Sequence, residues 1–192
     1  MNLEKLVEET DKLLPSSQIL PRLLVLLEDP DSNPTDVVSV VNVDPALTSQ
    51  VLTMSNSSYY GFGSPSVDLF DAVNRIGFQE LFRMVGICMA KSFGGSACEN
   101  YFLDEGELWE NSVATAIVCE MLAKLVHQSA NLAYTLGLLH SLGKLVINRL
   151  DGRRYAAVFE RVEEDGLALI EAENLMLGFN HADTCDALLR KW

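Results

Sequence analysis

Apolar residues recur every three to four positions along almost the whole chain, and this spacing predicts helices. The set Leu20, Leu23, Leu24 and Leu27, for example, marks a helix over residues 19–28. No run shows the sustained alternation of apolar and polar residues, separated by hairpin turns, that is typical of strands. We therefore predict an all-α fold, a multi-helix bundle of two packed helical lobes.

Turn and capping residues divide this pattern into individual helices. Asp44 followed by Pro45 is a typical helix start, because the aspartate accepts free backbone N–H groups and proline loses none at the first position. Gly77 is expected to break the helical stretch over residues 69–93. The remaining helices are predicted over residues 2–14, from a cap at Thr35 to residue 41, from a cap at Asp104 to residue 126, from a cap at Asn131 over residues 132–147, and over residues 153–164, 167–177 and 183–192.

The segment from Gly94 to Tyr101 is the predicted linker between the two lobes. It separates an N-terminal lobe of about residues 1–94 from a second lobe of about residues 102–192, within one domain of 192 residues. The helix over residues 132–147 is apolar on nearly all sides, so it is expected to be central and buried.

Charge and cysteine usage restrict the partners and the compartment. The chain has 27 acidic and 14 basic residues and a net charge of -13, which disfavours binding to nucleic-acid phosphates or to an anionic membrane. A neutral or basic protein surface is the more natural partner. The four cysteines form no CxxC pair or zinc-like spacing and are expected to be reduced thiols. Without a signal-peptide pattern or an apolar run of roughly 18 residues, we expect a cytoplasmic protein with no membrane partner.

His140 is the first candidate functional residue, because it lies in the central helix near Gly137 and Gly143. Each glycine costs a helix about 1 kcal/mol relative to alanine, so the pair indicates close approach of a neighbouring helix or of a ligand. A lone histidine in such a helix is more often a hydrogen-bonded core residue than a ligand.

Asn56, Tyr59 and Tyr60 form a second candidate group at a helix end. Asparagine there is typical of a C-cap that tolerates a left-handed backbone, and paired tyrosines typically seal an interface between lobes. Contact with a ligand or a partner is the alternative interpretation.

Several short motifs follow one another in a distinctive order and spacing along most of the chain. They are Leu14-Pro15, Asp29-Pro30-Asp31, Asp44-Pro45-Ala46-Leu47-Thr48, Asn56-Ser57-Ser58-Tyr59-Tyr60-Gly61, Trp109 with Ser112, Gly137-Leu138-Leu139-His140 with Gly143, Gly178-Phe179 with His181, and Leu188-Leu189-Arg190-Lys191-Trp192. In this combination the chain resembles the HDOD domain, the HD-related output domain of bacterial signalling proteins.

The resemblance also implies a set of metal-site positions. Related HD phosphohydrolases bind one or two metals through a histidine on an early helix, a consecutive His-Asp pair, and later His or Asp ligands. By motif alignment the early histidine position is Asn111 and the pair is His140 and Ser141, with His181 and Asp183 as later candidates. Two imidazoles without the anionic pair lose most of the charge that holds a divalent metal. We therefore expect a relict HD site with no catalytic residue, metal or cofactor.

One further departure concerns Cys185, which stands where the family pattern has glycine four residues after the histidine. Helix packing is expected to differ there.

The resemblance favours a non-catalytic signal-transduction module that acts through protein contacts, although fold alone does not give function. One alternative is a divergent metal-dependent phosphohydrolase that uses His140, His181 and Asp183. Another is a module that binds a nucleotide or second messenger without hydrolysing it, in which Lys144 and nearby arginines receive a phosphate. Those arginines are Arg149, Arg153, Arg154 and Arg161.

Family members usually continue beyond the position of Trp192, so we expect that the chain can be part of a longer regulatory protein. Truncation of such a protein at Trp192 would expose apolar surface and favour a homodimer.

Overall fold

The computed structural model describes residues 3–11, 18–60 and 64–191, and within these ranges it is helical apart from turns and one isolated bridge between Cys98 and Leu103. The predicted all-α fold is confirmed. In the described ranges no helix combines the length and the hydropathy that a membrane span requires. Leu14, Pro15, Gly61 and Trp192, which belong to the motifs quoted above, lie outside the described residues.

Residue contacts divide the chain into two compact units. The small unit is Ser16–Met89, and the large unit combines Met1–Pro15 with Ala90–Trp192. The sequence pattern places the first residues in the N-terminal lobe. Helix α1 (Leu3–Asp11) packs instead against α9 (Leu142–Ile147) and α12 (His181–Leu189), so it belongs to the large unit.

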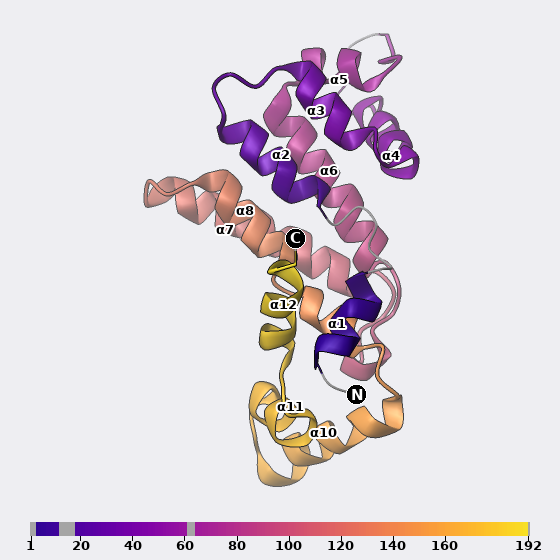
Figure 1. Ribbon diagram of the computed structural model, residues 1–192, viewed down its shortest axis with the longest axis vertical. Helices are drawn as coiled ribbons and strands as arrows, with labels where there is room; N and C mark the ends of the chain where they lie inside the picture. The colour runs from indigo at the N-terminus through magenta and orange to yellow at the C-terminus, as the bar shows by residue number, and fades with distance from the viewer. Residues whose placement is uncertain (1–2, 12–17, 61–63, 192) are drawn as a thin grey trace. The chain divides into compact units, whose positions relative to one another are not determined.

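The small unit is a cluster of short helices (Figure 1). They are α2 (Ile19–Glu28), α3 (Pro34–Val41), α4 (Pro45–Ser55), α5 (Leu69–Ile76) and the first part of α6 (Phe78–Gly94). Helix α3 packs against α2 and α5, and α4 packs against α5. Leu20, Val41 and Val51 are fully buried in this core.

The helix boundaries of the small unit follow its capping residues. Asp44 Oδ1 accepts from the backbone N–H groups of Ala46 and Leu47 at 2.9 and 3.0 Å, as predicted for the start of α4. Gly77 ends α5 with φ +85°, a conformation that favours glycine. Helix α3 is capped by Asn33 and not by Thr35, because Asn33 and Asp36 bond each other's backbone N–H in a capping box.

The large unit contains the remaining helices (Figure 1). Besides α1, α9 and α12 they are η1 (Glu99–Tyr101), α7 (Glu107–Leu125), α8 (Ala130–Leu139), α10 (Gly152–Asp165) and α11 (Leu169–Leu177). Helix α7 pairs with α8, α9 with α12, and α10 with α11. Helix α10 also contacts η1.

Two predicted caps in the large unit are wrong, and its last helix begins two residues before the predicted range. Helix α7 begins after Gly106, whereas the backbone N–H of Asp104 donates to Glu107 Oε2 at 2.7 Å. Helix α8 is capped by Ser129, which lies two residues before the predicted Asn131. Helix α12 begins at His181, because the Asn180 side chain accepts two backbone N–H groups there. In each case several capping residues stand close together, and the local pattern does not select among them.

The predicted central helix over residues 132–147 is broken at His140 and Ser141 into α8 and α9. The carbonyl groups that the break releases find other partners. His140 Nδ1 donates to Gly137 O at 2.7 Å, and the Cys185 thiol donates to Leu139 O at 3.3 Å. These two bonds satisfy part of the end of α8, and the second depends on a residue far along the sequence. Through this bond Cys185 joins the end of α8 to α12.

Gly137 and Gly143 both mark close helix contacts. A Cβ on Gly137 would lie 2.8 Å from the Ala116 Cα of α7. On Gly143 a Cβ would overlap the carbonyl group of His181 and lie 2.9 Å from the Cys185 backbone nitrogen. Of the two interpretations left open by the sequence, approach of a neighbouring helix explains both glycines.

Candidate functional site

Ser141, at the position of the HD aspartate, forms a buried hydroxyl pair with Ser112 of α7. The two Oγ atoms are 2.6 Å apart, and both side chains are at most 5% exposed. Ser112 Oγ donates to Leu108 O at 2.8 Å, so Ser141 is the donor of the pair and Ser112 its acceptor. Residue 141 thus ties the α8–α9 junction to α7.

Asn111, the predicted early-histidine position, is exposed on α7. Its neighbour Ser112 is the residue whose side chain contacts Ser141. Successive residues of a helix point about 100° apart, so the motif alignment selected the neighbour of the residue that faces the junction. The α7 residue that bonds Ser141 is therefore Ser112, the neighbour of Asn111.

His140 is exposed rather than buried, contrary to the interpretation as a core histidine. It is hydrogen-bonded as expected, through Nδ1 to Gly137 O. A carbonyl oxygen only accepts, so Nδ1 carries the proton and Nε2 is the ring nitrogen with the lone pair in neutral histidine.

Asp183 lies in the first turn of α12 and serves the helix end. Its Oδ2 accepts from the side-chain amide of Asn180 at 2.6 Å, while Asn180 Oδ1 accepts the backbone N–H groups of Ala182 and Asp183. Asp183 is exposed and is part of this capping arrangement.

The main polar cluster of the large unit is centred on Glu173 of α11, which the sequence analysis did not single out. Glu173 is 0% exposed. Its Oε1 accepts from the hydroxyl groups of Tyr101 and Tyr155 at 2.7 and 2.6 Å. Its Oε2 accepts from the backbone N–H and from Nδ1 of His181 at 2.8 and 2.6 Å. One carboxylate therefore holds together η1, α10 and the start of α12.

The hydrogen bonds decide the charge of this carboxylate. Burial alone would raise the pKa of Glu173, but bonds from His181, Tyr155 and Tyr101 stabilise the anion and hold the pKa below its ordinary value. Burial, together with bonding to Glu173, raises the pKa of both tyrosines. Glu173 is thus ionised while both phenols stay protonated, and each phenol donates.

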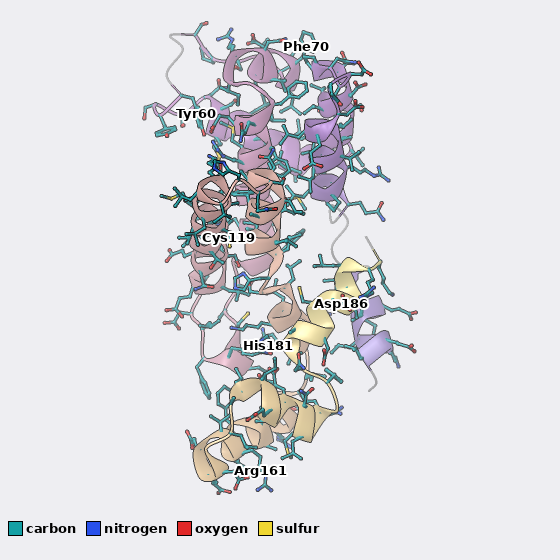
Figure 2. The ribbon with its side chains drawn as sticks, turned by 90° about the vertical axis from the view of Figure 1, so that its left-hand side faces the viewer. Tyr60, Phe70, Cys119, Arg161, His181 and Asp186 are labelled. Carbon is teal, nitrogen blue, oxygen red and sulfur yellow. The ribbon has the colours of Figure 1, made fainter. Side chains whose placement is uncertain are left out.

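His181 and Lys144 reach the partly exposed edge of this cluster. Figure 2 shows His181 at the end of α12 that lies toward α10 and α11. The His181 ring is 6.4 Å from the Tyr101 ring, edge to face, and its side chain is 23% exposed. Lys144 Nζ lies 5.5 Å from the centroid of the same Tyr101 ring, in cation–π geometry. The two basic side chains therefore contact one aromatic ring.

Glu173 could have been found from the sequence. Leu169, Ala172, Glu173 and Leu177 follow the three-to-four spacing of a buried helix face, and a carboxylate in that pattern needs buried donors. Tyr155 likewise lies on the buried face of its helix, three residues before the buried Val158 of α10.

The small unit holds the second predicted group. Asn56 is the C-cap of α4, as predicted, although its φ of -89° is not left-handed. Its side chain also pairs with the Ser66 backbone, accepting from N–H at 2.6 Å and donating to O at 3.1 Å. This amide therefore closes the loop between the two residues.

Tyr59 and Tyr60 stack edge to face with ring centroids 4.8 Å apart. Tyr59 is 84% exposed, and Tyr60 Oη lies 3.4 Å from Glu80 Oε2. A shallow hollow of about 460 Å³ runs along α4 between Pro45 and Asn56 and is completed by Asn42 and Ser66. Neither tyrosine lines it.

The relict positions do not fit the metal of the HD phosphohydrolases. Among the described residues no group of three or more His, Cys, Asp or Glu side chains is arranged to hold a metal ion. The donor set itself is unsuited, because the Ser141 hydroxyl is bonded to Ser112, Asn111 is an exposed amide, and Nδ1 of His181 is bonded to Glu173.

Comparisons with known proteins agree with this arrangement of helices. A crystal structure of an HDOD domain protein with unknown function from Geobacter sulfurreducens matches with a TM-score of 0.68 and 27% identity, over 91% of this chain and 58% of that one. A Shewanella amazonensis SB2B protein, described as a candidate phosphohydrolase, matches with a TM-score of 0.67 and 26% identity, over 97% of this chain and 66% of that one.

A curated relative extends well beyond the matched region. An uncharacterized protein of Treponema pallidum (strain Nichols) is 27% identical over 171 residues, which is 86% of this chain and 32% of that protein. The chain thus spans about a third of the length of this relative. The sequence model of the HDOD domain matches residues 13–192. The chain therefore belongs to the HDOD domain family, which is related to the HD phosphohydrolases.

Proposed function

We propose that this chain is a non-catalytic regulatory module of a signalling pathway, which transmits its signal through contacts with other proteins. The observation that carries the proposal is the buried pair of Ser141 and Ser112. A position that supplies a carboxylate ligand in the HD phosphohydrolases here holds two helices together. The net charge of -13 favours a neutral or basic protein partner.

The polar cluster supports the same function. Glu173 uses both oxygens to accept four hydrogen bonds, so His181 is held by Nδ1 in a fixed orientation. Such a network rigidifies the packing of η1, α10 and α12. A rigid helical unit suits a protein that presents a surface to a partner.

Turnover of phosphodiesters tests the proposal. Wild-type protein is incubated with bis(p-nitrophenyl) phosphate and with a cyclic nucleotide, each with Mn²⁺ added. We expect no hydrolysis above the protein-free rate and the same result for His140→Ala. Mn²⁺-dependent hydrolysis that His140→Ala abolishes, with the circular-dichroism spectrum unchanged, would establish the phosphohydrolase alternative.

A nucleotide-binding module is the second candidate, and the placement of Lys144 and His181 on one Tyr101 ring favours it. Two basic side chains side by side can receive a phosphate. A ligand that binds the folded state raises its melting temperature by mass action. A thermal-shift screen with nucleotides, repeated on Lys144→Gln, separates this candidate from a module that only contacts proteins.

A further inference from the structure

One face of α7 is apolar and exposed. Ile117, Met121 and Leu125 form one row at a spacing of four residues, and Val118, Leu122 and Val126 form the adjacent row. These six residues, which we call the outer α7 face, are between 45% and 75% exposed. Rows at this spacing lie side by side on one face of a helix.

The opposite face of α7 packs within the large unit. Ser112, Ala116 and Ala123 are buried, and Ala116 is the residue that Gly137 of α8 approaches closely. The outer α7 face is therefore not the side that α8 covers. Figure 1 shows α7 and α8 as a pair of neighbouring helices, and Cys119 is labelled on α7 in Figure 2.

The area of the outer α7 face is large for a monomer surface. From their exposed fractions, the six side chains present roughly 500 Å² of apolar surface, near the upper limit for the largest patch on a typical monomer. Two copies pairing through it would bury roughly 1,000 Å² in total, about the minimum for a specific interface. The area is thus sufficient for a weak, reversible dimer.

The charge pattern favours a second copy at this place. Two chains that each carry a net charge of -13 repel one another, so close approach requires a region without exposed carboxylates. Between Glu110 and Asp151 the sequence has one acidic residue, Glu120. Glu120 is 6% exposed, and its Oε1 lies 2.6 Å from Lys124 Nζ.

The next acidic residue on α7 lies far enough from the centre of the outer α7 face for its charge to be screened there. Glu110 precedes Met121 by eleven positions, or about 16 Å along a helix. This exceeds the Debye length of about 8 Å at physiological ionic strength. Repulsion from this carboxylate is therefore largely screened at the centre of the face.

We propose that two copies of this chain associate through the outer α7 face, with their α7 helices antiparallel about a two-fold axis at Met121. The symmetry places Met121 opposite Met121 of the other copy and Ile117 opposite Leu125. The inference is independent of the proposed regulatory function.

Sedimentation velocity of the full chain over a range of micromolar concentrations tests the proposal. We expect a concentration-dependent shift from monomer to dimer. Met121→Glu places two carboxylates together on the axis and should leave a monomer at every concentration. Val67→Glu is the matched control, because Val67 is 84% exposed in the small unit, and it should dimerise like wild type. Circular dichroism verifies that both variants fold.

Site-directed crosslinking tests the symmetry. In a Cys119→Ser background, Met121→Cys should form a disulfide-linked dimer under mild oxidation, whereas Val67→Cys should not. A wild-type chain that stays monomeric overturns the proposal, even if the face binds another protein. A dimer that Met121→Glu leaves intact, or equal crosslinking of both cysteine variants, also overturns it.

Discussion

Replacement of Glu173 by glutamine removes the charge at the centre of the large unit while it preserves the size of the side chain. The glutamine oxygen can still accept from Tyr101 and Tyr155. Its NH₂ group then faces the backbone N–H of His181, so two donors meet where the carboxylate accepted. A buried N–H consequently loses its partner.

The expected loss of stability follows from the number and type of these bonds. Hydrogen bonds to charged groups contribute about 1.5–3 kcal/mol each, and neutral ones about 1 kcal/mol. The two bonds from the tyrosines are weakened and the two bonds from His181 are disrupted. Glu173→Gln should therefore lower the free energy of unfolding by about 3 kcal/mol. This is a large share of the free energy of unfolding of a typical domain, which is roughly 5–15 kcal/mol.

Urea denaturation followed by circular dichroism measures the loss. Glu163→Gln is the matched control, because Glu163 is exposed on α10, and its free energy of unfolding should stay within about 0.5 kcal/mol of wild type. Equal stability of Glu173→Gln and wild type would refute the network as described.

The pH dependence gives a second test of the same residue. The pKa of Glu173 is lower in the folded state than in the unfolded state, so its contribution is present above the unfolded value of about 4.3 and is lost as pH falls through the folded value. The difference in stability between wild type and Glu173→Gln should therefore narrow as pH falls below about 4.3. A difference that stays constant over that range would show that the carboxylate is not ionised in the folded protein.

Two further predictions concern the same unit. Gly143→Ala should destabilise the protein by about 3 kcal/mol, because its Cβ would overlap the His181 carbonyl. Gly152→Ala is the control, because its Cβ would lie 3.6 Å from Asn100 Oδ1, an ordinary contact. Its free energy of unfolding in the same urea titration should stay within about 1 kcal/mol of wild type. Burial raises the pKa of Tyr101 and Tyr155, so their neutral forms stabilise the fold below about pH 10 and this contribution is lost as pH rises further. An ultraviolet titration should show Tyr101 and Tyr155 ionising only above the ordinary tyrosine value of about 10, and ionisation of all five tyrosines together at that value in the folded protein would contradict this.

Local signals were sufficient for much of the fold. The helix over residues 19–28, the start of α4 at Asp44 and the break at Gly77 agree with the sequence prediction, because apolar spacing, a capping side chain and glycine each act within a few residues. The break at His140 and Ser141 could not be predicted in this way. The Leu139 carbonyl that it releases is bonded by the thiol of Cys185, which lies on another helix.

The candidate site was predicted in part. Motif order identified Ser141 and His181, both of which lie in polar contacts of the large unit. Alignment by motif could not determine which of Asn111 and Ser112 faces Ser141, because that depends on the rotation of α7 against α8. Glu173 was missed because a glutamate on a helix is usually solvated, and its buried donors come from three other elements.

The central claim is that residue 141 now serves the packing of α7 against the α8–α9 junction. A double-mutant cycle with Ser112→Ala and Ser141→Ala, measured by urea denaturation, tests it most directly. Ser112→Ala leaves the buried Ser141 hydroxyl without its acceptor and should cost about 2 kcal/mol, more than Ser141→Ala, which leaves Ser112 bonded to Leu108 O. The account predicts a coupling energy of about 1 kcal/mol between the two substitutions, and strictly additive effects would contradict it.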